Sequence, residues 1–476
     1  MLFNSFAFLL FFPTVLAGYY MLRDYRQQNI WLLAASLFFY GSWDWRFLFL
    51  LLFTIVVDFM VARQIQRLRD ASGSPGAQRL LLTASIVANL GVLAFFKYYN
   101  FFENNLNGVA NWLHLPPTLP ALHVALAIGI SFFTFQSMSY TIDVYRGHLR
   151  AAERLTDFAL FVSFFPHLVA GPIMRAVDLL PQIVHPRRTT REQVEGGIHL
   201  IVWGFWKKMF VADNLAPIVN DFFSRGNLSG FEVLVAAYAF AFQIYGDFSG
   251  YTDIARGVAK LFGFELTLNF NLPYLSASPQ EFWTRWHISL STWLREYLYF
   301  SLGGNRRGGF LTYRNLLLTM VIGGLWHGAA WNFVLWGLYQ GVLLVGHRLL
   351  VPFFARLTVL AGTWRPVLRV FAIVVMFQFT CYGWLLFRAT SLAQIASMTH
   401  ALFFERWQIE PAQAWPLLVF AVPLAVLELA AGARLGFLQA WRRRLPLELR
   451  VAGYSVLAYL SIFLAAKPQS FIYFKF

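Results

Sequence analysis

Charged side chains are scarce in this sequence: Asp, Glu, Lys and Arg make up 13% of its 476 residues, against roughly 25% in soluble domains. This scarcity excludes an ordinary soluble globular protein. Apolar residues take their place and reach 58%, with 51 Phe among them, and the mean hydropathy is +0.55. The composition indicates a multi-spanning membrane protein with lipid as its solvent.

Cysteine is nearly absent, since Cys381 is the only one. A single thiol excludes an intramolecular disulfide, an iron–sulfur cluster and a cysteine-rich zinc site, and we expect Cys381 to fill space in an apolar helix. G-x-S-x-G, Walker A, G-x-G-x-x-G and H-E-x-x-H motifs are also missing, as are internal repeats. Any chemistry is therefore expected inside the membrane domain.

Long apolar runs define the predicted fold class. The run from Leu2 to Leu22 lacks the basic start and cleavage site of a signal peptide and is predicted as the first membrane helix. Later runs centre on residues 30–43, 45–62, 80–97, 121–144, 158–173, 194–220, 231–250, 315–346, 367–387, 413–430 and 451–466. They predict an all-α polytopic membrane protein of about 11 or 12 helices, several of them re-entrant or interfacial.

Basic residues outnumber acidic ones, 38 to 23, which gives a net charge of +15. Because the bases lie in short loops, they indicate the positive-inside bias of a membrane protein and no nucleic-acid partner. Four basic loops are placed in the cytoplasm: Arg63, Arg67, Arg69 and Arg79; Arg146, Arg150 and Arg154; Arg187, Arg188 and Arg191; Arg442, Arg443, Arg444 and Arg450. This topology predicts that both ends of the chain lie outside.

The run 158–173 differs from a simple span, because it is short and contains Pro166, Gly171 and Pro172 between two basic loops. A re-entrant hairpin explains why both flanks are basic, and irregular backbone at that depth indicates a cavity. An ordinary kinked pair of helices is the alternative.

His327 is the single titratable histidine within Asn315–Gly346, a stretch without Asp, Glu, Lys or Arg. An ionisable side chain at membrane depth is costly and marks a functional site by default. A neutral imidazole there could take a proton from an attacking hydroxyl. A hydrogen-bonded packing histidine is the alternative.

His287 lies within residues 279–299, a stretch that predicts an amphipathic helix at the cytoplasmic interface. Its apolar stripe consists of Trp286, Leu290, Trp293 and Leu294, and Glu281 precedes Arg285 by four positions, the favourable order for an ion pair. His287 is either functional or a plain interfacial residue. With 40 residues between the two histidines and no clear third ligand, we expect no metal site.

The loop Gly303–Gly309 combines four glycines with Arg306 and Arg307, a composition that can hold phosphates or simply form a basic turn. Asp247 and Asp253 lie at the end of an apolar run. Because Arg256 follows Asp253 by three positions, we expect a structural ion pair between them.

Five blocks in order along the chain resemble the membrane-bound O-acyltransferase (MBOAT) family, and within it the bacterial AlgI-type branch. They are SFFTFQSMSYTIDVYRG (Ser131–Gly147), FPHLVAGPIMR (Phe165–Arg175), Asp247–Asp253, Trp286–Tyr299 and WHGAAW (Trp326–Trp331). The resemblance implies one MBOAT transmembrane domain over residues 1–476, with a funnel-like helical fold and a central tunnel. It also implies that His327 is the active-site histidine and His287 the second family histidine.

The same resemblance implies an O-acetyltransferase of the bacterial inner membrane. The donor would be acetyl-CoA, with no bound cofactor, and the acetyl group would pass to a periplasmic hydrolase-like acetyltransferase that modifies a polysaccharide such as alginate, peptidoglycan or an exopolysaccharide. Because the chain ends soon after its last predicted helix, such a partner is expected to be a separate protein. A lipid or protein acceptor, or a transporter, are the alternatives.

In the expected reaction, His327 is the base for the acceptor hydroxyl, and apolar walls protect the thioester from water. Asn332 or the indole N–H of Trp326 could stabilise the oxyanion, and the sequence leaves this role open.

The C-terminal pattern Phe471-x-Tyr473-x-x-Phe476 resembles the end of the small membrane subunit in the related D-alanylation system, where the tyrosine is proposed to carry the acyl group. By this resemblance Tyr473 would enter the tunnel from outside, be deprotonated by His327 and pass acetyl to the partner. The alternative is an aromatic anchor at the membrane interface.

Overall fold

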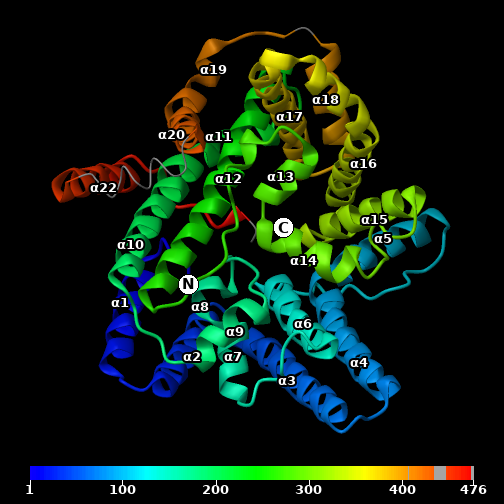
Figure 1. The fold of residues 1–476 in the computed structure, drawn as a ribbon. Helices are drawn as coiled ribbons and strands as arrows, with labels where there is room; N and C mark the ends of the chain where they lie inside the picture. The colour runs from blue at the N-terminus through cyan, green and yellow to red at the C-terminus, as the bar shows by residue number, and fades with distance from the viewer. Residues whose placement is uncertain (406, 434–445, 473–476) are drawn as a thin grey trace. The chain divides into compact units, whose positions relative to one another are not determined.

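The computed structural model describes residues 1–405, 407–433 and 446–472, and in these ranges the chain is helical and has no β-strand (Figure 1). The described chain divides into two compact units. The first holds residues 1–201 and 254–267, and the second holds residues 202–253 and 268–476. The all-α architecture predicted from the apolar runs is confirmed.

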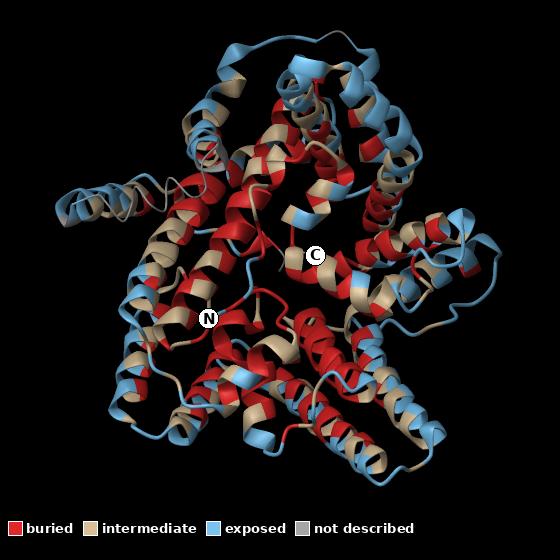
Figure 2. Ribbon diagram, viewed as in Figure 1, coloured by how far each residue is buried: buried red, intermediate tan, exposed pale blue. Residues whose placement is uncertain are grey.

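The first unit is built around α6 (Ile130–Arg146), which packs against α3, α4, α7 and α9. Every residue of α6 from Ile130 to Val144 is buried, as the red ribbon in Figure 2 shows. The other helices of this unit are α1 (Phe6–Met21), α2 (Tyr25–Gly41), η1 (Trp45–Phe47), α3 (Leu48–Asp70), α4 (Pro75–Leu93), η2 (Ala94–Tyr98), α5 (Tyr99–Trp112), α7 (Leu155–Ser163), α8 (Phe165–Leu168) and α9 (Ala176–Val184).

A buried carboxylate ties three of these helices together. Asp58 of α3 is fully buried and accepts hydrogen bonds from Ser85 and Asn89 of α4 and from Ser137 of α6. Because each bond satisfies a polar group away from water, the network fixes how α3, α4 and α6 pack.

The run 158–173 has irregular backbone, as its sequence predicts. α7 ends at Ser163, α8 covers only Phe165–Leu168, and no helix follows until α9 begins at Ala176. At Gly171 an added Cβ would lie 2.3 Å from the Cα of His167, so the turn requires glycine. A re-entrant path through the membrane stays a prediction.

The second unit contains the other elements, of which α10 (Arg191–Phe205) and α12 (Gly230–Leu261) contribute residues to both units. They are η3 (Trp206–Ala212), α11 (Asp213–Ser224), η4 (Pro273–Leu275), α13 (Pro279–Arg285), α14 (Ile288–Trp293), η5 (Leu294–Tyr299), α15 (Gly309–His327), α16 (Trp331–Leu360), η6 (Gly362–Trp364), α17 (Arg365–Arg388), α18 (Leu392–Phe404), α19 (Pro411–Pro416), η7 (Leu417–Ala421), α20 (Val422–Ala433) and α22 (Leu447–Phe463). Cys381 is buried in α17, as expected.

Several helices begin where a capping side chain satisfies an otherwise unpaired N–H group. Ser5, Asp24, Ser278 and Ser391 each accept a hydrogen bond from the backbone N–H three residues ahead, at the starts of α1, α2, α13 and α18. These boundaries are therefore encoded locally by the sequence.

Six helical stretches among the described residues have the length and apolar composition to cross a membrane. They are Trp45–Asp70, Pro75–Trp112, Gly230–Leu261, Trp331–Leu360, Gly362–Arg388 and Pro411–Ala430, and Phe6–Met21 and Leu392–Phe404 are shorter apolar helices. Other predicted runs form short or interrupted helices, which is the expected behaviour of re-entrant or interfacial segments.

α15 and α16 lie side by side with little between their backbones (Figure 1). An added Cβ at Gly324 would lie 2.2 Å from the carbonyl oxygen of Phe333, and one at Gly337 would lie 2.4 Å from that of Met320. Small residues therefore permit the close crossing, as they do between membrane helices generally.

Candidate active site

His327 is the last residue of α15, at a break in what the sequence presents as one apolar run. Residues 328–330 are not helical, and α16 begins at Trp331, so the run 315–346 forms parts of two helices and not a single span. Gly328 is required there, because a Cβ would lie 2.2 Å from the ring of Phe333. The break puts the imidazole at a helix end, where its ring can face neighbours from other elements.

Aromatic rings surround His327, which is 4% exposed. Its ring centroid lies 5.1 Å from those of Trp326 and Trp336 and 5.4 Å from that of Phe387, and the Trp336 ring is perpendicular to it. Such a wall excludes water from the imidazole and strengthens every electrostatic interaction that the ring makes.

His287 occupies a second break, between α13 and α14, and its backbone adopts a left-handed conformation with φ of 43° and ψ of 52°. The continuous amphipathic helix expected through this region is therefore wrong: two short helices meet at His287. A bulky residue rarely adopts this backbone, and such strain is found where the surrounding structure fixes a residue for function.

A hydrogen bond defines the tautomer of His287. Asn269 Oδ1 accepts from the backbone N–H and the hydroxyl of Ser289, which identifies it as the oxygen, and it lies 3.2 Å from His287 Nδ1. Nδ1 must therefore carry the proton, and Nε2 of the neutral ring keeps its lone pair. Full burial lowers the pKa of His287 to about 3, so the ring is neutral at physiological pH.

The two histidines belong to one aromatic cluster. Their ring centroids are 6.5 Å apart, and Trp326 lies beside both, 5.9 Å from the His287 ring. The predicted apolar stripe, Trp286, Leu290, Trp293 and Leu294, is buried, and Glu281 and Arg285 form the predicted ion pair at 3.0 Å. The structure thus joins two sites that are 40 residues apart in the sequence.

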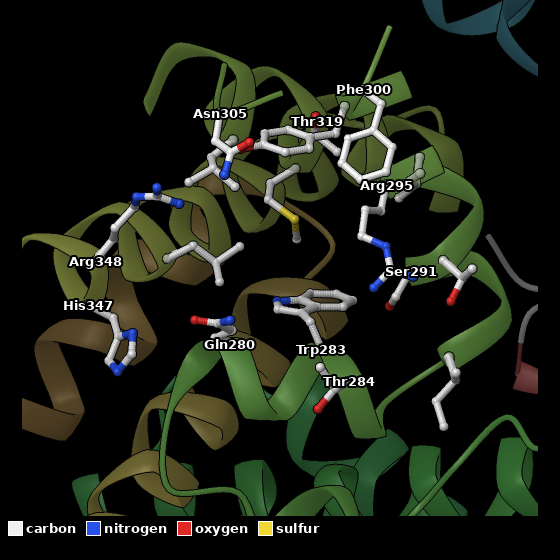
Figure 3. Close-up of a pocket in the computed structure, with 17 residues that line it drawn as sticks. Gln280, Trp283, Thr284, Ser291, Arg295, Phe300, Asn305, Thr319, His347 and Arg348 are labelled. Atoms are coloured by element: carbon white, nitrogen blue, oxygen red, sulfur yellow. The ribbon is translucent and has the colours of Figure 1, made fainter. Parts of the chain in front are cut away.

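A cavity of about 570 Å³ opens beside this cluster (Figure 3). Ile288, which follows His287, and Met320, two turns before His327 on α15, both line it. Trp283 forms part of the wall, and Arg295 and Arg348 lie on opposite sides. Arginines on two sides suit an anionic organic molecule. The two histidines lie beside the cavity and are not among the residues that line it.

Sequence reasoning missed the two arginines of the cavity and selected Arg306 and Arg307, which are exposed and lie outside its lining residues. Their neighbour Asn305 does line it. Arg295 lies within the Trp286–Tyr299 block, where nothing marked it as a ligand, and Arg348 lies outside all five blocks. Only the packing of α13, α14, η5, α15 and α16 places the two arginines on one cavity.

The remaining predicted residues have defined surroundings, with one exception. Asn332 is buried and donates from Nδ2 to the carbonyl oxygen of Phe387 at 3.1 Å, so it anchors α16 to α17. Asp253 forms an ion pair with Lys207 at 2.7 Å, and the pair expected between Asp253 and Arg256 stays a prediction. Tyr473 lies outside the described residues.

The described part of the C-terminal segment enters the same unit. Phe471 and Ile472 are buried, and the ring of Phe471 lies 5.7 Å from that of Phe248, which lies 4.7 Å from the ring of His287. Phe248 therefore separates the end of the described chain from the imidazole.

Comparison with protein families shows to which family the chain belongs. The family model described as MBOAT, membrane-bound O-acyltransferase family, matches residues 126–393, a range that contains both histidines and every residue lining the cavity. The chain belongs to the membrane-bound O-acyltransferase family. It is accordingly an acyltransferase, and the resemblance noted in its sequence is confirmed.

Individual members of the family extend the likeness over most of the chain. "Probable alginate O-acetylase AlgI" of Azotobacter vinelandii is 43% identical over 90% of this chain and 84% of its own length. "Peptidoglycan O-acetyltransferase" of Helicobacter pylori is 36% identical over 82% of this chain and 78% of its own length. "Teichoic acid D-alanyltransferase" of Bacillus subtilis is 29% identical over 58% of this chain and 71% of its own length.

The buried, neutral His287 predicts a pH dependence of stability in this acyltransferase. Its pKa of about 3 in the folded chain lies below the usual value near 6.5, so the unfolded chain binds the additional proton and stability falls as pH drops below 6.5. At pH 5.5, one unit below the pKa of the imidazole in the unfolded chain, uptake of this one proton should lower the free energy of unfolding by roughly 1.4 kcal/mol. Thermal unfolding of the detergent-purified protein at pH 7.5 and 5.5 measures it.

His287→Asn is the matched variant, because Asn tolerates the left-handed backbone and can still donate to Asn269. Its unfolding temperature should fall less between the two pH values than that of the wild type. Identical falls in both proteins would contradict a neutral, buried imidazole.

Proposed function

We propose that this chain is an O-acetyltransferase of the bacterial inner membrane. It would take acetyl from cytoplasmic acetyl-CoA and deliver it to an extracytoplasmic polysaccharide through a separate periplasmic acetyltransferase. The observation that carries the proposal is an arginine-lined cavity beside the pair of buried histidines, with Ile288, the residue after His287, and Met320, two turns before His327, in its wall. The names of the relatives, which are O-acetylases of alginate and peptidoglycan, support the acetyl group and a glycan acceptor.

The cavity is the proposed entry for the donor. Coenzyme A carries several phosphates at one end and the thioester at the other, and Arg295 and Arg348 offer guanidinium groups on two sides. Trp283 offers an apolar wall for the thioester arm. Arg306 and Arg307, exposed in the turn that holds Asn305, are proposed as outer contacts for the same phosphates.

The chemistry needs one base and a dry environment. His327 would accept the proton of an attacking hydroxyl, whose oxygen forms the new C–O bond as the C–S bond of the thioester breaks. The leaving thiolate would then take this proton from His327. Rings of Trp336 and Phe387 would protect the thioester from hydrolysis.

Trp326 is the better of the two proposed oxyanion donors. Its ring lies beside the imidazoles of both His287 and His327, whereas the amide of Asn332 donates to the backbone of Phe387. We assign Asn332 instead to holding α16 against α17 at the site.

Tyr473 is proposed as the acceptor that receives acetyl first. Its support is the likeness of Phe471-x-Tyr473-x-x-Phe476 to the motif of the D-alanylation subunit, together with the burial of Phe471 and Ile472 near Phe248. A phenol with a pKa near 10 needs an adjacent base, and its ester is activated enough to pass acetyl on.

His327→Ala should lower polymer acetylation by about 10²–10⁴-fold, because the general base is removed. The release of free CoA thiol is measured with the purified protein. The ester content of the polymer is measured in the bacterial host. His400→Ala, at an exposed histidine of α18, is the control and should keep full activity. Near-normal acetylation by a well-folded His327→Ala protein would refute the assignment.

Replacing both Arg295 and Arg348 with Gln should raise the apparent KM for acetyl-CoA about tenfold or more and change kcat less, because binding to the unreactive end of the donor is lost. The double variant of Arg306 and Arg307 should raise this KM only a few fold, since these two side chains lie outside the residues that line the cavity. Gln at the exposed Arg23 and Arg26 is the control for net charge. An unchanged KM in the first variant would exclude the cavity as the donor site.

Tyr473→Phe removes one oxygen and keeps the ring. If the tyrosine carries acetyl, polymer acetylation should fall to the level of His327→Ala, whereas an aromatic anchor would tolerate the change. Acetylated Tyr473 should also accumulate in wild-type protein incubated with acetyl-CoA without the periplasmic partner, as intact-mass and peptide mass spectrometry would show. Full activity of Tyr473→Phe would exclude the relay.

A further inference from the structure

One lysine and two aspartates form a buried ion cluster in the second unit. Lys208 Nζ lies 2.9 Å from Asp213 Oδ1 and 2.7 Å from Asp247 Oδ1, and each of the three side chains is at most 4% exposed. One ammonium group cannot neutralise two carboxylates. Buried charges are stable only when other donors and acceptors complete their hydrogen bonds, so the cluster needs further partners.

The C-terminal segment Leu464–Ile472 supplies these partners from its backbone. The N–H of Ile472 donates to Asp247 Oδ2 at 2.6 Å, and Lys208 Nζ donates to the carbonyl oxygen of Gln469 at 3.0 Å. The residue after Asp213, Asn214, donates from Nδ2 to the carbonyl oxygen of Leu464 at 2.9 Å. The segment is therefore held at three points, and its path in red beside α12 can be followed in Figure 1.

Two ring contacts connect this segment to the active-site cluster. Phe471 is fully buried, with its ring 4.7 Å from that of Tyr251 and 5.7 Å from that of Phe248. Phe248 in turn contacts the His287 ring edge to face at 4.7 Å. A shift of the segment would therefore disturb a neighbour of His287 directly.

We propose that Lys208, Asp213 and Asp247 form a clamp that positions the C-terminal segment for acyl transfer. They are positioning residues, because they contact the segment and not the reacting atoms. The proposal rests on the proposed function, in which Tyr473, the next residue along, receives the acetyl group. The clamp would fix the register of the segment, because Asp247 binds the backbone N–H of Ile472 and Lys208 binds the backbone carbonyl oxygen of Gln469.

The neighbouring lysine gives a matched control. Lys207 is as buried as Lys208 and also pairs with an aspartate, but its partners are Asp253 and Ser249, and no hydrogen bond joins it to the C-terminal segment. Lys207→Met and Lys208→Met therefore each remove one buried lysine charge, and only the second releases the segment.

The first experiment measures release without using activity. In full-length protein with Cys381→Ala and Ile472→Cys, the thiol at position 472 is the only one, and its rate of reaction with N-ethylmaleimide reports exposure. We expect slow labelling in this parent and in Lys207→Met, and labelling at least tenfold faster in Lys208→Met and Asp247→Leu. Asp247→Asn keeps an oxygen that accepts from the N–H of residue 472, so its labelling should stay closer to the parent.

The second experiment measures acetyl transfer and leaves the ion cluster intact. Ile472→Pro removes the N–H that Asp247 binds, whereas Ile472→Val keeps it and most of the side chain. We expect Ile472→Pro to lower kcat at least tenfold with an unchanged KM for acetyl-CoA and an unfolding temperature close to that of Ile472→Val. The Val variant should keep kcat near the wild-type value.

Each result decides between the clamp and a general role in folding. Equal acceleration of labelling by Lys207→Met and Lys208→Met would overturn the clamp, and so would unchanged labelling in Asp247→Leu. Faster labelling in Lys208→Met and Asp247→Leu, combined with a normal kcat in Ile472→Pro, would show that the segment is held but not positioned for transfer. This combination also overturns the proposal. An inactive wild type in the acetyl-CoA assay, with the labelling pattern as expected, would instead locate the failure in the proposed donor or acceptor.

Discussion

The close contact between the backbones of α15 and α16 is the constraint on which the active site depends. Gly324 and Gly337 bring each helix against the carbonyl oxygens of the other, and this crossing carries His327 at the end of one helix to Trp336 and Phe333 near the start of the next. Because lipid tails are as apolar as the helices, the hydrophobic effect does not drive two apolar helices together. Van der Waals packing of this kind therefore supplies the free energy of their association. The position of the imidazole is thus determined by van der Waals contacts between the two helix backbones, at Gly324 and Gly337, and not at the ring itself.

Neutral rings suit this environment better than charges would. Enclosure by Trp326, Trp336 and Phe387 disfavours a charge on the His327 ring. In the proposed reaction the neutral ring would take up a proton as negative charge develops nearby. The surroundings of His287 also avoid a charge, because Asn269 orients its ring with an uncharged oxygen. Among the charged groups of the unit, Lys207 and Asp253 form a buried pair, and Arg295 and Arg348 lie at the wall of the open cavity.

The sequence predicts the features that arise from local patterns and composition. The helical class, the buried stripe that includes Trp286 and Leu290, the Glu281–Arg285 pair and the burial of His327 all follow from residue types at short spacing. The break at His287 does not, because its left-handed backbone is stabilised by Asn269 and Ser289 through tertiary hydrogen bonds. Arg295 and Arg348 reach the same cavity only through packing between helices. Lys208 pairs with Asp247 although no periodicity relates the two residues.

The hydrogen bonds of Lys208 and Asp247 with the C-terminal segment also bear on the order in which the chain is made. Gln469 follows Lys208 by 261 residues and Ile472 follows Asp247 by 225, so the ribosome produces the cluster long before its backbone partners. At about 5–20 residues per second, the cluster waits on the order of ten seconds or more for them during synthesis. The hydrogen bonds to Gln469 and Ile472 can therefore form, and the second unit can complete its packing, only after translation has passed Ile472.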